Sequence, residues 1–294
     1  MITIIGASGN TGGGIAEILL NKGKKIRVIG RNAENLKKFT DKGADSAIGD
    51  ILNPEFLSNA FKGSKAVYVM IPPYFGAENV RAYQNEVSTA IVNAIISAGV
   101  KNVIMLSSIG AHLTEGAGVV QGLYDFEQKL NALLGINCVY LRAGFFMENS
   151  FGSINMIKEM GIYGMPLRPD VKMAFVATKD IAEMGAKYLL DMNFKGKTIQ
   201  YVLGPKDYTP SEFTKIIGTA IGNPKLSYVQ FPYEDSENAM AGVGMSSDMA
   251  KSMVQLMRAL NDGKIYDPEW RNSTNTTNTS VEEFSKLFSA VYSS

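Results

Sequence analysis

The chain begins with an apolar run, ITII, that leads at once into the glycine-rich segment GASGNTGGG. Gly6, Gly9 and Gly12 follow the pattern GxxGxxG where a β-branched run gives way to helical periodicity. Such glycines permit a tight turn and close approach of the backbone to a pyrophosphate, and free N–H groups at the helix start attract the anion. The segment predicts a dinucleotide site, and a tight turn without a ligand is the alternative. The side chains between the glycines, Ser8, Asn10 and Thr11, either bind phosphate or ribose or cap the helix.

The rest of the first half repeats this alternation of apolar runs and amphipathic stretches. Strands are expected at 2–7, 25–30, 46–50, 65–71, 102–108 and 137–143, with helical segments between them. Runs that are apolar on both faces belong in a parallel sheet covered by helices on both sides. We therefore predict an α/β fold, with a Rossmann-type doubly wound parallel sheet formed by residues 1–145. Residues 146–294 have a looser pattern and are expected to form a smaller α/β part, interleaved with the first, that binds the substrate or a partner.

The ends of the second, third and fourth strands carry the next candidates, because a doubly wound sheet binds ligands at the carboxyl ends of its strands. After the second strand, Arg31 and Asn32 stand where an acidic residue would accept from a ribose 2′-hydroxyl. A guanidinium here suits a 2′-phosphate, so NADP(H) is favoured and NAD(H) stays possible. Asp50 and Ile51 follow the third strand and are expected to flank the adenine. The prolines of MIPPYF, after the fourth strand, form either a stiff loop over the dinucleotide or a plain rigid loop.

Composition excludes several classes of function. The chain has 294 residues, of which 46% are hydrophobic and 19% charged, and a net charge of +1 without runs of like charge. No binding to nucleic acid or to a membrane is therefore expected, and the direct start with ITII, without a signal peptide, indicates a cytoplasmic protein. One histidine and one cysteine predict no metal site, and the cysteine, Cys138, is expected to be a small buried residue. No G-x-S-x-G elbow or Walker loop points to hydrolase or kinase chemistry.

Several motifs in order carry a family resemblance. These are GASGNTG, RN after the second strand, GD after the third, LSSIGA at the fifth and LRAGFFMEN at the sixth. The chain thereby resembles the atypical short-chain dehydrogenase/reductase group, and within it the NmrA-like proteins, which include NAD(P)H:quinone-oxidoreductase-like members. The resemblance extends through VLGPKDYTPSEF and TSVEEF, and so covers most of the chain.

The resemblance implies roles for particular residues. The cofactor's phosphates would be held by Gly6, Ser8, Gly9, Asn10, Thr11, Gly12 and Arg31, with Asp50, Ile51, Ile71 and Pro72 beside adenine and ribose. Ser107, Ser108 and Gly110 would approach the nicotinamide, and Phe145, Phe146, Glu148 and Asn149 would face both nicotinamide and substrate.

The chain departs from the catalytic pattern of the wider family, in which a Tyr-x-x-x-Lys pair follows the fifth strand. Here the helix reads GLYDFEQKL, so Tyr124 is followed four residues later by Gln128, and Lys129 is one residue out of register. Many NmrA-like relatives keep a lysine about four residues before a glutamate; if Glu127 is that glutamate, the lysine position is Leu123. Tyr124 is either a proton donor at an altered angle or an ordinary packing tyrosine. His112, after LSSIGA, either assists proton delivery or faces solvent.

The sequence thus favours an NADPH-dependent reductase of a small flat electrophile such as a quinone, acting by direct hydride transfer. The alternative is a non-catalytic NADP(H)-sensing regulator that binds a protein partner, and a nucleotide-sugar epimerase is less favoured. The Met-rich stretch 241–253 is expected to be gap-filling core or an adaptable pocket wall. Aromatic residues available for a substrate pocket are Tyr74, Phe75, Phe145, Phe146, Tyr163 and Phe231.

Overall fold

The computed structural model describes residues 1–294, and its main element is a seven-stranded sheet in which all neighbouring strands are parallel. The strand order is β10-β6-β5-β4-β1-β2-β3, so the chain moves outward from β1 to β3 and then crosses back to place β4 beside β1. This reversal creates the crevice at which doubly wound sheets bind ligands. The Rossmann-type fold expected from the sequence is confirmed. The strands are β1 (Ile2–Ile5), β2 (Ile26–Gly30), β3 (Asp45–Ile48), β4 (Ala66–Val69), β5 (Asn102–Ser108), β6 (Asn137–Ala143) and β10 (Lys197–Val202).

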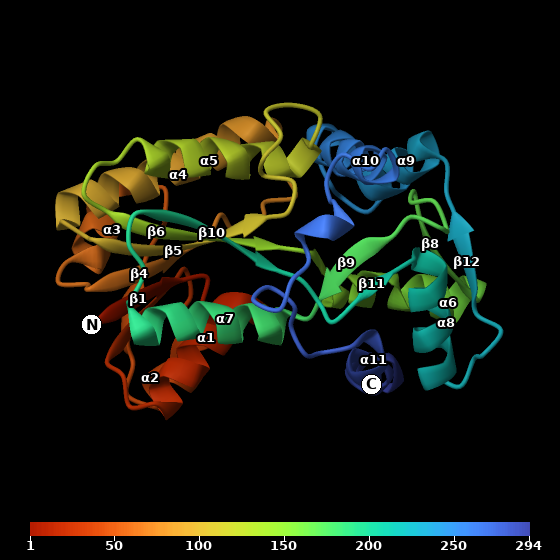
Figure 1. The fold of residues 1–294 in the computed structure, drawn as a ribbon, viewed down its shortest axis with the longest axis horizontal. Helices are drawn as coiled ribbons and strands as arrows, with labels where there is room; N and C mark the ends of the chain where they lie inside the picture. The colour runs from red at the N-terminus through yellow and green to blue at the C-terminus, as the bar shows by residue number, and fades with distance from the viewer.

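Helices cover both faces of this sheet (Figure 1). Every residue of β1 and β4 is buried, which explains why these strands read as continuous apolar runs without alternation. Cys138 in β6 is fully buried, and burial raises the pKa of its thiol to about 12. One face packs against α3 (Pro54–Phe61), α4 (Val80–Ala98) and α5 (Gln121–Asn131), the other against α1 (Asn10–Asn21), α2 (Lys37–Thr40) and α7 (Thr178–Asp191).

Small residues bring α1 and α7 into close contact. A Cβ built on Gly14 would lie 2.7 Å from the Cβ of Ala182, and one on Gly185 would lie 2.8 Å from Cδ1 of Ile15. The two helix backbones can approach this closely only because these positions carry no side chain. The packing fixes α1, whose first turn borders the ligand crevice.

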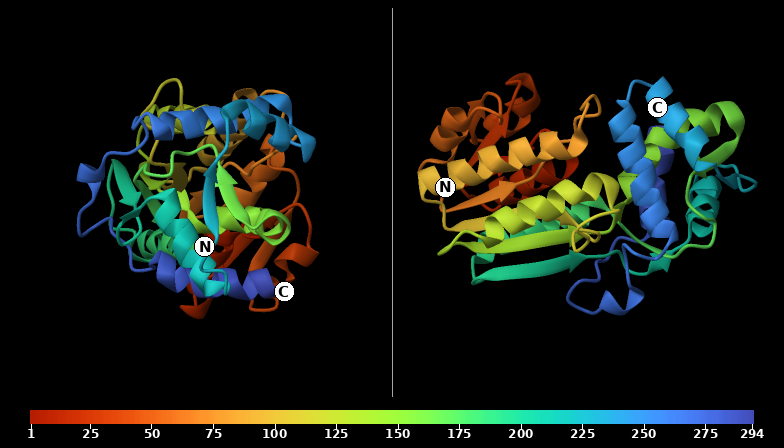
Figure 2. Two further views of the ribbon diagram at one scale, coloured as in Figure 1. Left: turned by 90° about the vertical axis from the view of Figure 1, so that its right-hand side faces the viewer. Right: turned by 90° about the horizontal axis from the view of Figure 1, so that it is seen from above.

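The chain leaves the large sheet after β6 and forms a second group of elements beside it (Figure 2). It then returns through α7 and β10, which joins β6 at the edge of the large sheet, and leaves again. Two small sheets belong to the second group: β11 (Asp207–Tyr208), β9 (Met173–Val176) and β7 (Phe145–Phe146) in one, β12 (Ser227–Gln230) and β8 (Ile162–Met165) in the other. Its helices are α6 (Ile154–Met160), α8 (Pro210–Ala220), α9 (Tyr233–Gly242), α10 (Ser247–Asn261) and α11 (Val281–Ser293).

An aromatic core holds the second group together. Phe175 of β9 stacks on Phe213 of α8 at 4.7 Å between ring centroids, and Phe284 of α11 lies 6.4 Å from Phe213. A capping box at the start of α8, formed by Thr209 and Glu212, fixes where that helix begins. None of the helices combines the length and the apolar character needed to cross a bilayer.

Candidate functional site

The glycine-rich turn after β1 is shaped by contacts that only glycine permits. Gly6 has a φ of 74°, in the left-handed region. A Cβ on Gly12 would lie 2.5 Å from the carbonyl oxygen of Gly6 and 2.9 Å from that of Ile5, so any side chain there must force the turn open. Gly9 differs, because its Cβ would meet only the Gly6 oxygen, at an ordinary 3.4 Å. The space in front of Gly9 is therefore open, and a side chain would fill it.

This open space lies at the amino end of α1. Gly9 precedes the helix without a side-chain cap, and the first turn carries no acidic residue. The first amides of a helix have no partner within it, so those of α1 present N–H groups and the positive end of the helix dipole. The turn therefore has the geometry and charge that a pyrophosphate needs. Ser8 and Asn10 are exposed here, whereas Thr11 is buried and its hydroxyl accepts a hydrogen bond from Tyr68 at 3.0 Å.

A groove of about 360 Å³ continues from this turn across the ends of β2, β3 and β4. Arg31 is exposed in it and forms no ion pair within the protein, so its guanidinium is available to a ligand. Asp50 and Asn32 instead accept nearby backbone N–H groups, from Leu52 at 3.0 Å and from Glu34 at 2.8 Å. Asn32 lies outside the groove. The sequence candidates that line it are Gly6, Ser8, Arg31, Asp50, Ile51, Pro72 and Tyr74.

The proline loop after β4 is held against this groove. Tyr83 of α4 donates a hydrogen bond to the carbonyl oxygen of Pro72 at 3.2 Å, and its ring meets Tyr74 edge-on with 5.3 Å between centroids. Burial raises the pKa of Tyr83. Further along, Ser246 donates its backbone N–H to the Phe75 oxygen at 2.8 Å, which ties the loop to the start of α10. The loop thus contacts both the groove and the neighbouring group of elements.

A second, apolar cavity of about 280 Å³ lies at the ends of β4, β5 and β6. Of its 20 lining residues, 16 are hydrophobic, and none is charged. The sequence candidates in its wall are Ile71, Ser107, Ser108, Phe145, Phe146 and Asn149. The sequence did not identify five other residues of the wall, which are Leu123, Met173, Leu256, Met257 and Ile265. The Met-rich stretch 241–253, expected as core or pocket wall, contributes its last residue, Met253.

Behind the cavity, Glu127, Arg142 and Ser107 form a buried polar cluster. Arg142 of β6 donates to Glu127 of α5 from Nη2 at 2.6 Å and from Nε at 3.0 Å. The hydroxyl of Ser107 donates to the same carboxylate at 2.5 Å. Glu127 is 1% exposed, Ser107 3% and Arg142 6%. Arg142 could not be assigned to this cluster from the sequence, because its neighbours in the chain form an ordinary apolar strand.

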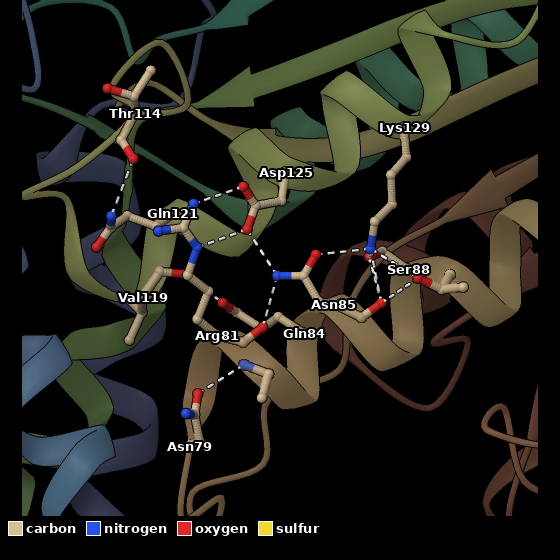
Figure 3. A network of polar contacts seen from close by, with 12 residues as sticks. Asn79, Arg81, Gln84, Asn85, Ser88, Thr114, Val119, Gln121, Asp125 and Lys129 are labelled. Atoms are coloured by element: carbon tan, nitrogen blue, oxygen red, sulfur yellow. Dashed lines mark hydrogen bonds and ion pairs between the residues drawn. The ribbon is translucent and has the colours of Figure 1, made fainter.

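Lys129 does not line the cavity, and its side chain lies in a polar network between α4 and α5 (Figure 3). Its Nζ donates to the carbonyl oxygen and Oδ1 of Asn85, at 2.9 and 2.8 Å, and to Ser88 at 2.8 Å. Burial against α4 lowers the pKa of Lys129. In the same network Arg81 pairs with Asp125 through two hydrogen bonds, at 2.7 and 2.8 Å. These contacts tie the two helices together.

Other sequence candidates lie outside the apolar cavity. Tyr124 does not line it, and the ring nitrogens of His112 lie 3.1 Å from the oxygen of Ile109 and 3.2 Å from that of Lys264. The Glu148 carboxylate accepts the backbone N–H of Thr178, at 2.9 Å, and so caps α7. Gly110 packs on Ile265 behind the wall.

The expected aromatic pocket is not assembled as a whole. Tyr74 and Phe75 are half exposed, and Tyr74 lines the groove and not the cavity. Tyr163 is buried in the aromatic core, and Phe231 packs over Gly164. Only Phe145 and Phe146 of the six aromatics reach the cavity, because they follow β6 directly.

Comparisons with known proteins found relatives of similar sequence and similar fold. NAD(P)H azoreductase of Xenophilus azovorans is 27% identical over 256 residues, which are 87% of this chain and 86% of that protein. The structure of NADPH-dependent quinone oxidoreductase QOR2 from Escherichia coli, complexed with NADPH, has a TM-score of 0.83 at 22% identity and covers 98% of this chain and 99% of its own. NmrA, a negative transcriptional regulator solved with NADP, has a TM-score of 0.74 at 12% identity over 99% and 95% of the two chains. The family model described as NmrA-like matches residues 1–290, and the chain therefore belongs to the NmrA-like family.

Proposed function

We propose that this protein is an NADPH-dependent reductase of a small, flat, electron-poor acceptor such as a quinone. The observation that carries the proposal is the apolar cavity at the ends of β4, β5 and β6, on the same edge of the sheet as the glycine-rich turn that follows β1. When bound, the dihydronicotinamide supplies the hydride. The azoreductase relative and the quinone oxidoreductase structure support a reductase.

Different residues would bind different parts of the cofactor and the acceptor. Amides of the glycine turn would hold the pyrophosphate, and Arg31 would pair with the 2′-phosphate. Phe145 and Phe146 supply aromatic surface for a flat ring, and the apolar wall excludes water from it. Few polar groups line the cavity, so it is poorly matched to the hydroxyls of a nucleotide sugar, and we do not propose epimerisation.

Cofactor choice can be tested at Arg31. We expect Arg31→Ala to weaken NADPH binding roughly 10- to 100-fold, because a hydrogen bond to a charged group contributes about 1.5–3 kcal/mol. The affinity for NADH should change less than about threefold, since it has no 2′-phosphate. Titration of cofactor fluorescence measures both. Lys25→Ala is the matched control, an exposed cation just before the same strand. Equal losses for the two cofactors would contradict the assignment.

The proton requirement gives a second test. The polar side chains of the cavity are the hydroxyls of Ser107 and Ser108 and the amide of Asn149, none of which titrates near neutrality. We therefore expect the reduced acceptor to take its protons from water. At saturating NADPH, kcat/KM for a quinone should be flat between about pH 6 and 8. A rate that falls as the pH rises, and loses this dependence in Tyr124→Phe or His112→Gln, would assign the proton to one of these side chains.

A non-catalytic NADP(H)-sensing regulator is the second candidate. The observation that favours it is the absence of any acid or base from the cavity, with Lys129 engaged by α4. A quinone panel with NADPH, followed by the loss of absorbance, separates the two. Turnover that disappears in Gly9→Asp supports the reductase; tight binding without turnover on every acceptor supports the regulator and its protein partner.

A further inference from the structure

The buried cluster behind the cavity fixes which way the Ser107 hydroxyl points. A carboxylate accepts hydrogen bonds and donates none, so the 2.5 Å contact between Ser107 Oγ and Glu127 Oε1 must use the hydroxyl hydrogen. Ser107 has only one such hydrogen. On its cavity side the oxygen can therefore offer only lone pairs.

Arg142 pairs with Glu127 as a carboxylate, which is the form that accepts the Ser107 hydroxyl hydrogen. The guanidinium meets the carboxylate at two points, 2.6 and 3.0 Å, and a buried pair of this kind keeps both groups ionised. Arg142 Nη2 also donates to the carbonyl oxygen of Ala111 at 3.4 Å, in the turn that follows β5. The cluster thus connects α5, β6 and the end of β5.

The side chains of Ser108 and Asn149, by contrast, have donor groups without a partner in the protein. Neither the Ser108 hydroxyl nor the Asn149 amide hydrogen-bonds to another protein group, although both residues line the cavity. They keep free donors. Within one apolar cavity, Ser107 is an obligate acceptor and these two side chains can donate.

We infer that Ser107, directed by Glu127 and Arg142, accepts the carboxamide N–H of the nicotinamide and so selects the orientation of the ring. This inference rests on the proposed function. Ser107 is then a cofactor-contacting residue, and Glu127 and Arg142 are positioning residues that act through it. Ser108 and Asn149 are left to donate to the oxygen of the acceptor.

Two cofactor analogues test this acceptor role without turnover. The oxidised 3-acetylpyridine analogue of NADP replaces the carboxamide nitrogen by a methyl group and has no N–H, whereas the thionicotinamide analogue keeps it. The wild-type protein should bind the thionicotinamide analogue roughly three- to tenfold more tightly than the acetylpyridine analogue, as one hydrogen bond predicts. In Ser107→Ala this ratio should fall toward one. Ser58→Ala, which removes a serine hydroxyl in α3 outside the cavity, is the control and should keep the wild-type ratio.

Glu127→Gln provides an independent readout. The glutamine amide can donate to Ser107, which frees the hydroxyl hydrogen to turn toward the cavity. The preference for the thionicotinamide analogue should then shrink or reverse. The same ratio in wild type and Ser107→Ala, with all proteins folded, would overturn the assignment while leaving the proposed function intact. Failure of the wild-type protein to bind any of the dinucleotides would overturn both.

Discussion

Replacement of Glu127 by leucine should lower the free energy of unfolding by about 3–5 kcal/mol, because it leaves the Arg142 charge buried without its partner. Glu127 and Arg142 are 1% and 6% exposed, so water cannot replace the lost carboxylate without opening the ends of β5 and β6. Urea unfolding followed by circular dichroism measures the change.

The double variant Glu127→Leu with Arg142→Met distinguishes this cause from loss of packing. If an unpaired charge produces the instability, removing both charges should restore part of the stability, and the double variant should lose less than the two single variants together. Asp41→Asn is the control for an exposed ion pair, because the side chains of Asp41 and Lys37 are 59% and 58% exposed. Breaking this pair should lower the free energy of unfolding by only about 0–1 kcal/mol. Strict additivity of the Glu127 and Arg142 changes would contradict this account.

The large sheet and the glycine-rich turn after β1 could be predicted because their signals are local. Apolar runs of strand length followed by helical periodicity leave few arrangements, and right-handed crossovers reduce them to the doubly wound sheet. At the turn, Gly6 is favoured by its own positive φ, and Gly12 by the backbone oxygens of Gly6 and Ile5, so both requirements arise within one short segment.

The apolar cavity could not be predicted in this way because distant segments build it. Met257 and Ile265 reach the ends of β5 and β6 from more than a hundred residues along the chain, and their spacing is that of any amphipathic segment. The sequence also could not predict the direction in which a side chain points. Thr11 lies in the chain between Gly9 and Gly12, but its side chain turns inward to Tyr68, and the side chain of Glu148 turns to the start of α7.

Gly9 and Gly12 of the glycine-rich turn should differ in how alanine affects the stability of the fold. At Gly12 the added Cβ would lie 2.5 Å from a backbone oxygen, and backbone cannot move aside as a flexible side chain can. Gly12→Ala should therefore destabilise the fold by about 1–3 kcal/mol and distort the site as well. At Gly9 the Cβ makes an ordinary 3.4 Å contact, so the unfolding free energy should change by less than about 1 kcal/mol.

Measurements of NADPH binding should separate the loss of affinity from the loss of stability. The Gly9→Ala methyl group projects into the open space at the start of α1, where a pyrophosphate would lie against the amides. We expect roughly tenfold or weaker binding of NADPH, which corresponds to about 1.4 kcal/mol, in a protein as stable as the wild type. Isothermal titration calorimetry and thermal unfolding on the same samples give both quantities. Unchanged NADPH affinity in a fully folded Gly9→Ala variant would mean that phosphate does not rest on this turn, and the proposed cofactor site would then be misplaced.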